Sequence, residues 1–304
     1  MLPFVFDGGQ VVYQGKVWNM IYLSQFAFPS VTAEEQYLHR IRETCYTSVY
    51  PFEILTKHDL HSLNFDESVT ILYGGNGSGK TTALNVIAEK LQSDRDTLYN
   101  RSDFFGKYVD FCDYVLEREL PERNRIITSD DVFDFMLNIR SLNEGIDRKR
   151  GELFQNYYDN KSSDFQLHSL EDYEQLVKVN AARRKSKSQY VREQLKNNVR
   201  EHSNGESAYL YFTDKIQENG LYLLDEPENS LSPERQQELV SFIEESARFF
   251  ACQFIIATHS PFLLSMKHAK IYNLDENPVQ TAKWTELPNV RAYYEFFKAH
   301  ESCF

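Results

Sequence analysis

A glycine-rich stretch with one lysine is the first segment of this 304-residue chain whose residue types indicate chemistry. It reads Gly74-Gly75-Asn76-Gly77-Ser78-Gly79-Lys80-Thr81 and matches the pattern GxxxxGK[ST] in full. Such a loop turns successive main-chain N–H groups inward and forms an anion nest at a helix N-terminus. In this pattern Lys80 reaches the β- and γ-phosphates of a nucleotide, and the Thr81 hydroxyl binds Mg²⁺. The spacing therefore predicts a phosphate-binding site that includes Thr82, the next residue.

An acidic pair ends an apolar segment later in the chain. The segment LYLLDE places Asp225 and Glu226 at the C-terminal end of a predicted strand, where open α/β sheets bind ligands. Asp225 fits a carboxylate that helps to hold Mg²⁺, and Glu226 fits the base that orients or deprotonates an attacking water. An acidic pair alone is usually a turn or a helix cap. The preceding phosphate loop makes the catalytic interpretation dominant.

Two further segments are ambiguous when taken alone. IIATHSP ends another apolar run with His259, and a lone histidine there is more often a structural hydrogen-bonding residue. Beside the other motifs, His259 becomes the candidate for a γ-phosphate contact. SNGES, residues 203–207, is either a helix cap or a second phosphate-binding turn with donors from Ser203 and the Gly205 N–H. The residues alone do not decide between these two interpretations.

The elements that must position these residues alternate between strand and helix patterns. Predicted strands are 69–73, 221–226 and 252–260, and predicted helices are 81–91 and 233–250. Residues 1–68 are rich in aromatic and β-branched side chains, which predicts a small mixed sheet with strands in VWNMIYLSQF and YPFEIL. KIYNLDE and the stretch up to Lys283–Glu286 are predicted as later strands, and Val290–Ala299 as a closing helix.

Residues of about 130–200 differ from the rest of the chain. They are charged, nearly free of Gly and Pro, and periodic like helices, with the turn-forming DNKSSD between two halves. This predicts a helical lobe, formed as an antiparallel pair, inserted into a parallel α/β core. The predicted single domain thus comprises N-terminal strands (1–68), a core part with the phosphate loop (69–129), the helical lobe insertion (130–200) and the remaining core (201–304).

Composition narrows the function classes. The net charge of -12 argues against electrostatic binding of nucleic acid by the chain as a whole. The four cysteines show no CxxC spacing, which favours reduced thiols over a metal site, and no apolar run approaches the ~18 residues that span a bilayer. With no cationic start at the N-terminus, a signal peptide is not expected, and a cytoplasmic protein is predicted.

One local basic cluster stands out against this charge. The segment 178–200 contains one acidic residue, Glu193, and eight basic ones. These are Lys178, Arg183, Arg184, Lys185, Lys187, Arg192, Lys196 and Arg200. The cluster is either a solvated helix face or a surface, within 178–200, for nucleic acid or an effector protein.

The order of the motifs resembles the ABC-ATPase superfamily. The phosphate loop, SNGES, LLDEPENSLS and ATHS correspond to Walker A, signature, Walker B with D-loop, and H-loop. The residues within these motifs are similar to those of a group of stand-alone bacterial AAA-type ATPases, which share S-x-G-E-S, GLYLLDEPE and QFIIATHSP runs. This chain has SNGES, GLYLLDEPENSLSPERQ and QFIIATHSPFLL. The resemblance covers residues of about 68–92 and 200–300.

The resemblance implies a P-loop α/β fold of ABC type, ATP and Mg²⁺ as ligands, and a head-to-tail homodimer. ATP would lie between the Walker motifs of one subunit and the signature of the other, so that Ser203, Gly205 and Glu206 act in trans. Ser230-Leu231-Ser232 would lie at the dimer seam as the D-loop. SNGES departs from the LSGGQ of transporters. No clear Q-loop glutamine occurs, the weak candidate being 100–103, and no aromatic residue is identifiable as the adenine platform.

Three functions follow from these motifs. The first is a cytosolic ATPase of SMC-like or RecF-like character, in which ATP-driven dimerisation serves a nucleic-acid or defence task. The second is the ATP-binding subunit of a transporter, although SNGES, DEPEN and THSP look unlike transporter motifs. The third is a slow ATP switch that gates a partner effector such as a nuclease; the intact Glu226 argues that hydrolysis is retained.

Overall fold

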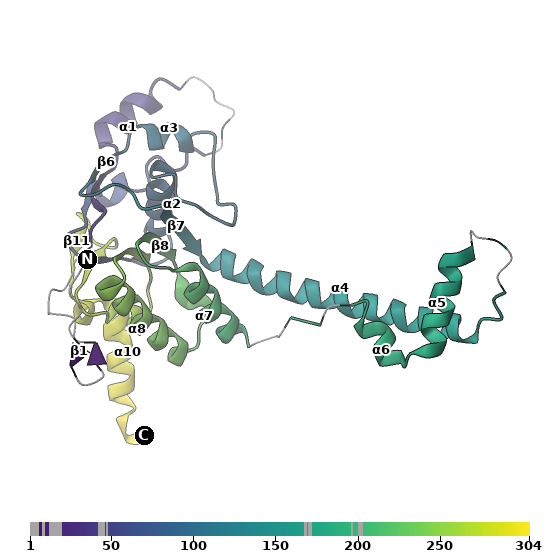
Figure 1. Ribbon diagram of the computed structural model, residues 1–304. Coiled ribbons are helices and arrows are strands. Elements are labelled where there is room, and N and C mark those ends of the chain that lie inside the picture. The colour runs from purple at the N-terminus through teal and green to yellow at the C-terminus, as the bar shows by residue number, and fades with distance from the viewer. Residues whose placement is uncertain are drawn as a thin grey trace. The chain divides into compact units, whose positions relative to one another are not determined.

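The computed structural model describes residues 6–7, 10–11, 20–41, 46, 48–166, 169, 172–195, 197–199 and 203–304. The chain forms two compact units (Figure 1). The core unit comprises Met1–Val132 and Asn204–Phe304, and the helical unit comprises Phe133–Ser203. Within the described residues, no helix combines the length and the apolar character needed to cross a membrane.

A six-stranded sheet organises the core unit. Its order is β11 (Gln280–Thr281), β10 (Ala269–Asn273), β5 (Val69–Tyr73), β9 (Cys252–Ala257), β8 (Gly220–Asp225) and β7 (Arg123–Thr128). All neighbouring pairs are parallel except the pair of β10 and β11. Every residue of β5, β8 and β9 is buried, which accounts for their largely apolar sequences, since a parallel sheet is covered on both faces. The predicted α/β fold class is confirmed.

The register of the central strands brings three chain segments to one edge of the sheet. Leu72 of β5 pairs with Ala257 of β9, and Ala257 pairs with Asp225 of β8. The loops that follow these strands therefore leave the sheet side by side. This is the edge at which open parallel sheets bind ligands.

Helices cover this sheet, and their first residues mark where the loops after the strands end. Helix α2 (Lys80–Lys90) packs against β7, β8 and β9, and α8 (Pro233–Phe249) packs against β9. The remaining elements of this half are α7 (Asn204–Lys215), the 3-10 helix η3 (Pro227–Ser230), α9 (Pro261–Leu264), η4 (Trp284–Glu286), α10 (Pro288–Ala299) and η5 (Glu301–Cys303). The predicted strand up to Lys283–Glu286 is wrong: only Gln280–Thr281 pairs with β10, and a 3-10 turn leads into the proline that starts α10.

The N-terminal part forms an antiparallel three-stranded sheet in the order β4 (Ser62–Asn64), β3 (Leu23–Ala27), β6 (Asp113–Leu116), and a two-stranded sheet of β1 (Phe6–Asp7) and β2 (Gln10–Val11). Helices α1 (Val31–Leu38) and α3 (Phe105–Asp110) were not predicted; the Ser30 side chain caps α1 by accepting from the Ala33 N–H. The expected strand YPFEIL is a turn that leads into η1 (Thr56–His58), since Pro51 cannot donate to a ladder. Of VWNMIYLSQF, residues 17–19 lie outside the described residues.

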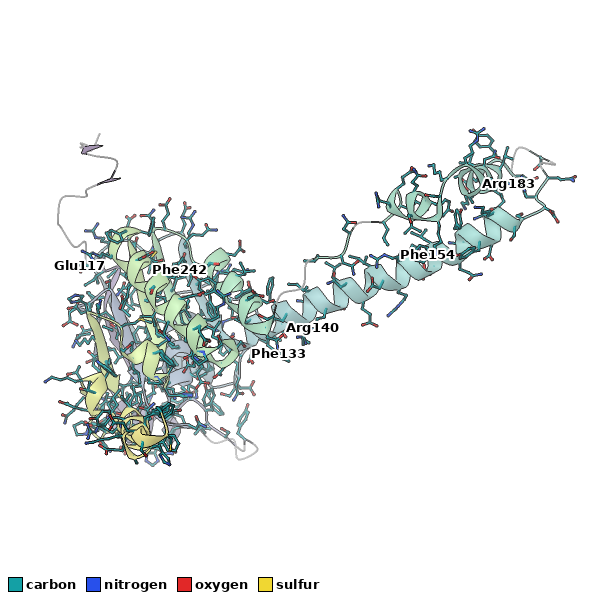
Figure 2. The ribbon with its side chains drawn as sticks, turned by 90° about the horizontal axis from the view of Figure 1, so that it is seen from below. Glu117, Phe133, Arg140, Phe154, Arg183 and Phe242 are labelled. Carbon is teal, nitrogen blue, oxygen red and sulfur yellow. The ribbon has the colours of Figure 1, made fainter. Side chains whose placement is uncertain are left out.

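The helical unit contains most of α4 (Ser129–Ser162), followed by α5 (Tyr173–Arg184) and α6 (Lys187–Arg192). The predicted antiparallel pair is therefore one long helix and two short ones. The break occurs at Ser186, whose side chain accepts from the Gln189 N–H while Gln189 bonds back, forming a capping box. A small core joins the three helices and is formed by Leu153, Tyr157, Ala182, Tyr190 and Val191. Figure 2 labels Phe154 of α4, which packs on this core, and Arg183 of α5.

Candidate functional site

The glycine-rich loop connects β5 to α2 and borders a pocket of about 360 Å³. Gly77 and Gly79 adopt φ angles of 85° and 91°, in the left-handed region that favours glycine. Gly79 is the N-cap of α2, so the loop runs into a helix N-terminus whose first N–H groups have no helical acceptor. The pocket is lined by Ile54, Asn76, Gly77, Ser78, Gly79, Lys80, Thr81, Thr82 and Glu226.

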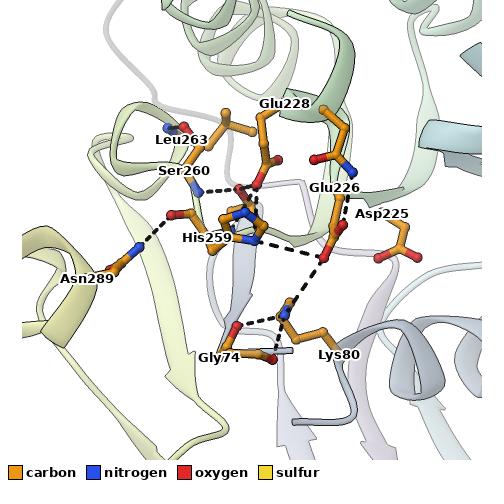
Figure 3. A network of polar contacts seen from close by, with 12 residues as sticks. Gly74, Lys80, Asp225, Glu226, Glu228, His259, Ser260, Leu263 and Asn289 are labelled. Carbon is orange, nitrogen blue, oxygen red and sulfur yellow. Dashed lines mark hydrogen bonds and ion pairs between the residues drawn. The ribbon is translucent and has the colours of Figure 1, made fainter. Parts of the chain in front are cut away.

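Lys80 is buried at the base of this loop (Figure 3). Its Nζ donates to the carbonyl oxygen of Gly74 at 2.7 Å and to that of Gly75 at 3.1 Å. The same Nζ lies 3.9 Å from Glu226 Oε1. The loop's own carbonyls thus fix the position of the ammonium group, and the group borders the pocket as a point charge suited to an anion.

Thr81 and Asp225 bring two oxygen atoms together between α2 and β8. Thr81 Oγ1 donates to Asp225 Oδ1 at 3.1 Å. Burial of Asp225 raises the pKa of its carboxyl to about 7; the Thr81 hydrogen bond and Lys80 oppose this effect, and the charges of Glu226 and Glu228 add to it. A hydroxyl and a buried carboxylate are hard oxygen donors, the type that Mg²⁺ prefers. These two residues therefore fit a Mg²⁺ ion, which would take over the neutralising role of the proton.

Glu226 follows β8 in a left-handed conformation, with φ 49° and ψ 52°. This region is costly for a residue other than glycine and is found where the surroundings impose it. Here the Glu226 N–H donates to the Ala257 carbonyl at 2.9 Å, and Asn229 Nδ2 donates to Oε2 at 3.0 Å. The other oxygen, Oε1, lies 3.9 Å from both Lys80 Nζ and His259 Nδ1. The carboxylate is thus held between these two side chains at the pocket.

His259 follows β9 and keeps nearly half of its side chain exposed. Its main-chain N–H donates to Glu228 Oε1 at 3.0 Å, and its carbonyl accepts from Asn289 Nδ2 at 2.6 Å (Figure 3). Its Nδ1 lies 3.8 Å from Glu228 Oε1. The backbone of the histidine is therefore held on both sides, while the ring remains accessible.

The signature residues lie elsewhere in the structure. Gly205 is in the first turn of α7, and a Cβ built on it would lie 3.8 Å from the Ser230 carbonyl oxygen and the Ser232 nitrogen. Glu206 Oε1 lies 3.7 Å from Arg235 Nη2. Ser203, Gly205 and Glu206 are not among the residues that line the pocket of the phosphate loop. The signature turn is instead next to the predicted D-loop of its own chain.

Several contacts at the site come from residues that sequence patterns did not single out. Asp275 accepts from the Gly75 N–H at 2.9 and 3.0 Å, and Ile54 lines the pocket. Glu228 belongs to the DEPEN run, and its position two residues after Glu226 is the sequence feature that could have identified it as part of the site. Asn289 and Asp275 come from segments without a motif. The weak Q-loop candidate, 100–103, is not part of the lining either.

Family profiles match two segments of the chain. The profile of the family described as ABC transporter matches residues 61–229, more than half of the chain. A second profile, for an AAA domain whose description names the AbiEii toxin and type IV toxin–antitoxin systems, matches residues 200–265. No curated protein sequence matches significantly.

Solved structures also resemble the chain. The Smc head domain with an extended coiled coil, bound to the C-terminal domain of ScpA and derived from Pyrococcus furiosus, is 14% identical over 77% of this chain and 94% of that one, with a TM-score of 0.39. The SMC head domain from Thermotoga maritima is 14% identical over 73% and 92%, with a TM-score of 0.35. A nucleotide-free ATP-binding cassette from an ABC transporter is 14% identical over 77% and 90%, with a TM-score of 0.38. With the profile match over more than half of its length, the chain belongs to the ABC transporter family of P-loop ATPases.

Proposed function

We propose that this protein binds ATP with Mg²⁺ and hydrolyses it to ADP and phosphate. The observation that carries the proposal is the meeting of Lys80, Asp225, Glu226 and His259 at the aligned ends of β5, β8 and β9, beside one pocket. A lysine at a phosphate loop, a hydroxyl–carboxylate pair and a base are the parts that phosphoryl transfer to water requires.

In this proposal the loop 74–82 and Lys80 bind the phosphates of ATP. Thr81 and Asp225 hold Mg²⁺, which neutralises phosphate charge when bound. Glu226 Oε1 accepts a proton from, or orients, the attacking water; its other oxygen is already engaged by Asn229, which fixes the carboxylate. His259 contacts the γ-phosphate with its accessible ring.

We further propose that ATP closes a head-to-tail homodimer. Ser203, Gly205 and Glu206 would complete the site of the other subunit, which is supported by their not lining the pocket of their own chain. The short space beside Gly205, where an added Cβ would lie 3.8 Å from Ser230 and Ser232, would keep signature and D-loop together at the seam.

The test is Glu226→Gln, which keeps the shape of the side chain and the Asp225 ligand but removes the base. We expect normal ATP binding, loss of phosphate release by at least a hundredfold, and accumulation of an ATP-bound dimer in light scattering with Mg-ATP. ADP should not produce the dimer, because only the triphosphate reaches the second subunit.

Different results would reject different parts of the proposal. Wild-type turnover in Glu226→Gln would end its role as base. An active wild-type enzyme whose Glu226→Gln form stays monomeric with saturating ATP would reject the sandwich dimer. A wild-type protein that binds Mg-ATP and releases no phosphate would reject hydrolysis altogether.

The partner is a separate part of the proposal. The helical unit carries 13 Lys and Arg against 11 Asp and Glu, in a chain with 33 against 45. Of the basic cluster, Lys178, Arg184 and Arg192 are exposed, while Lys185 pairs with Glu193 and Lys187 lies 4.6 Å over the Phe154 ring. Lys196 and Arg200 lie outside the described residues. We propose that this cluster binds nucleic acid, with an acidic effector protein as the alternative.

A salt titration of duplex and single-stranded DNA and RNA binding tests this, with ATP present. Affinity should fall steeply with salt, because each neutralised phosphate releases counterions. Charge reversal at Lys178, Arg184 and Arg192 should abolish binding and leave basal ATPase activity unchanged, whereas reversal of Arg148, which pairs with Glu144, should have a smaller effect. No binding at low salt would reject nucleic acid.

Two alternative functions keep specific support. The match to the ABC transporter profile favours the ATP-binding subunit of a transporter. The AAA profile, whose description names a toxin of type IV toxin–antitoxin systems, keeps a defence task open, for which we propose a slow ATP switch that gates an effector such as a nuclease. The turnover rate separates the switch from a fast ATPase. Co-purification with a membrane protein would support the transporter subunit.

A further inference from the structure

Glu228 is a buried carboxylate between the Walker B turn and the segment that carries His259. Only 7% of it is exposed. Its Oε1 accepts two hydrogen bonds, one from Thr258 Oγ1 at 2.7 Å and one from the His259 N–H at 3.0 Å. One oxygen atom therefore holds both the Thr258 side chain and the main chain at His259.

The second oxygen of Glu228 is not engaged by these two donors. Oε2 is buried and has no hydrogen-bond partner among the described residues. Leaving a buried acceptor unsatisfied is destabilising, and more so for a charged group, so such an atom calls for a role. His259 Nδ1 lies 3.8 Å from the other oxygen of this carboxylate, Glu228 Oε1, and 3.9 Å from Glu226 Oε1.

These positions specify which ring nitrogen carries a hydrogen. A carboxylate accepts hydrogen bonds and does not donate them, so a nitrogen that faces two carboxylates is stabilised with its hydrogen attached. Nδ1 is that nitrogen here. The other nitrogen, Nε2, is then left for the nucleotide. The separation of 3.8 Å between Nδ1 and Glu228 Oε1 is longer than a hydrogen bond, and catalytic contacts often tighten only in the bound state.

We propose that Glu228 is a positioning residue, which fixes the main chain of His259 and keeps the hydrogen of its ring on Nδ1, so that Nε2 is presented to the phosphate. The proposal rests on the proposed function of His259. Glu228 touches neither nucleotide nor metal in this scheme and acts through the histidine.

Glu34 provides a matched control within the same chain. It is also buried, at 2% exposure, and one of its oxygens accepts from a main-chain N–H, that of Glu53 at 2.9 Å, and from a threonine hydroxyl, that of Thr56 at 3.0 Å. No histidine is among these donors. Glu34→Gln therefore reports the general effect of neutralising a carboxylate bonded in this way, and Glu228→Gln adds the effect on His259.

The first experiment observes the ring directly and needs no turnover. In ¹⁵N-histidine-labelled protein, the His259 signals are identified by their absence in His259→Ala. We expect the Nδ1–H form in the wild type and in Glu34→Gln. Glu228→Gln keeps the oxygen that accepts from Thr258 and the His259 N–H but removes one of the two negative charges that face Nδ1, so we expect a larger share of the Nε2–H form. The same form of the ring in wild type and Glu228→Gln would overturn the proposal, whether or not the protein hydrolyses ATP.

The second experiment is a double-mutant cycle on ATP hydrolysis. Glu228→Gln should lower kcat at least tenfold with KM changed less than threefold, since phosphate binding by the loop is intact. Glu34→Gln should leave kcat within twofold of the wild type. In a His259→Ala background, Glu228→Gln should change kcat less than twofold, because the residue through which it acts is gone.

The outcomes distinguish failure of the proposed role of His259 from failure of the positioning role of Glu228. If His259→Ala alone has wild-type turnover, the proposed role of His259 fails. If His259→Ala is impaired and Glu228→Gln lowers kcat by an equal factor in both backgrounds, Glu228 acts independently of the histidine and the positioning role fails.

Discussion

The pH dependence of folding gives a direct check on Asp225 as a metal ligand. In the metal-free protein, burial above all raises the pKa of this carboxyl from 3.8 to about 7. A carboxyl with a higher pKa in the folded state binds its proton more tightly there than in the unfolded chain. Its contribution to stability is therefore fully present below pH 3.8 and is lost as pH rises through about 7.

The size of the effect follows from the shift. The change from 3.8 to about 7 is roughly 3 pKa units, each worth ~1.4 kcal/mol, so ionising Asp225 in the folded protein costs about 4 kcal/mol. Between pH 5 and pH 7 the free energy of unfolding of the wild type should fall by about 2 kcal/mol relative to that of Asp225→Asn. Asparagine keeps the oxygen that accepts from Thr81 and has no charge to bury.

The assay is urea denaturation of both proteins in EDTA at pH 5, 6, 7 and 8. The stability difference between them should grow steadily up to pH 7 and then level off. Adding Mg²⁺ and ADP at pH 8 should stabilise the wild type more than Asp225→Asn, because a cation takes the place of the proton. A stability difference that is the same at all four pH values would refute the raised pKa and the reasoning built on it.

Three further results are expected. Lys80→Ala should abolish ATP binding, measured by calorimetry, with the fold intact by circular dichroism; normal affinity would reject the phosphate-loop assignment. Mixing Lys80→Ala with Gly205→Asp subunits, each inactive alone, should restore part of the ATPase activity, since one composite site then has two intact halves; full activity of Gly205→Asp alone would remove the signature assignment. Asp96 accepts from Lys215 at 2.7 Å, which holds the pKa of its carboxyl at about 2. Because 39% of that side chain is exposed, Asp96→Asn should cost only ~1 kcal/mol at pH 7, and the loss should fade as pH falls from about 4 to 2; equal urea midpoints at pH 7 would contradict it.

The positions of the main site residues could be predicted from sequence because each follows a strand that is buried along its whole length. Continuous apolar runs identify β5, β8 and β9, and parallel strands end at one edge of a sheet. The motif at the end of each run then has a defined place. The structure accordingly brings Lys80, Asp225, Glu226 and His259 together.

The supporting contacts could not be predicted because they depend on long-range packing. Asn289 reaches the His259 carbonyl from the start of α10, 30 residues later in the chain, and Asp275 reaches Gly75 from the loop after β10. Neither spacing nor residue type marks such pairs. Local geometry also overrode composition: the Ser186 capping box divides a segment that reads as one helix.

Several destabilising features of the folded protein gather at this site. The carboxyl of Asp225 is buried with a raised pKa, Glu226 is held in a left-handed conformation, and Ser78 Oγ and Glu228 Oε2 are buried without partners among the described residues. Each of these costs falls within or next to the three aligned loops, while the strands that carry the loops are buried along their whole length. Under the proposed function, a cation neutralises the buried charge of Asp225, and phosphate oxygens accept hydrogen bonds from the N–H groups of the loop. The folded protein therefore holds these groups in position before Mg-ATP binds. Binding to the folded state alone raises stability by mass action. ATP should therefore raise the melting temperature strongly with Mg²⁺ and weakly with EDTA, and an equal rise in both conditions would show that the metal ligands and the phosphate loop act independently.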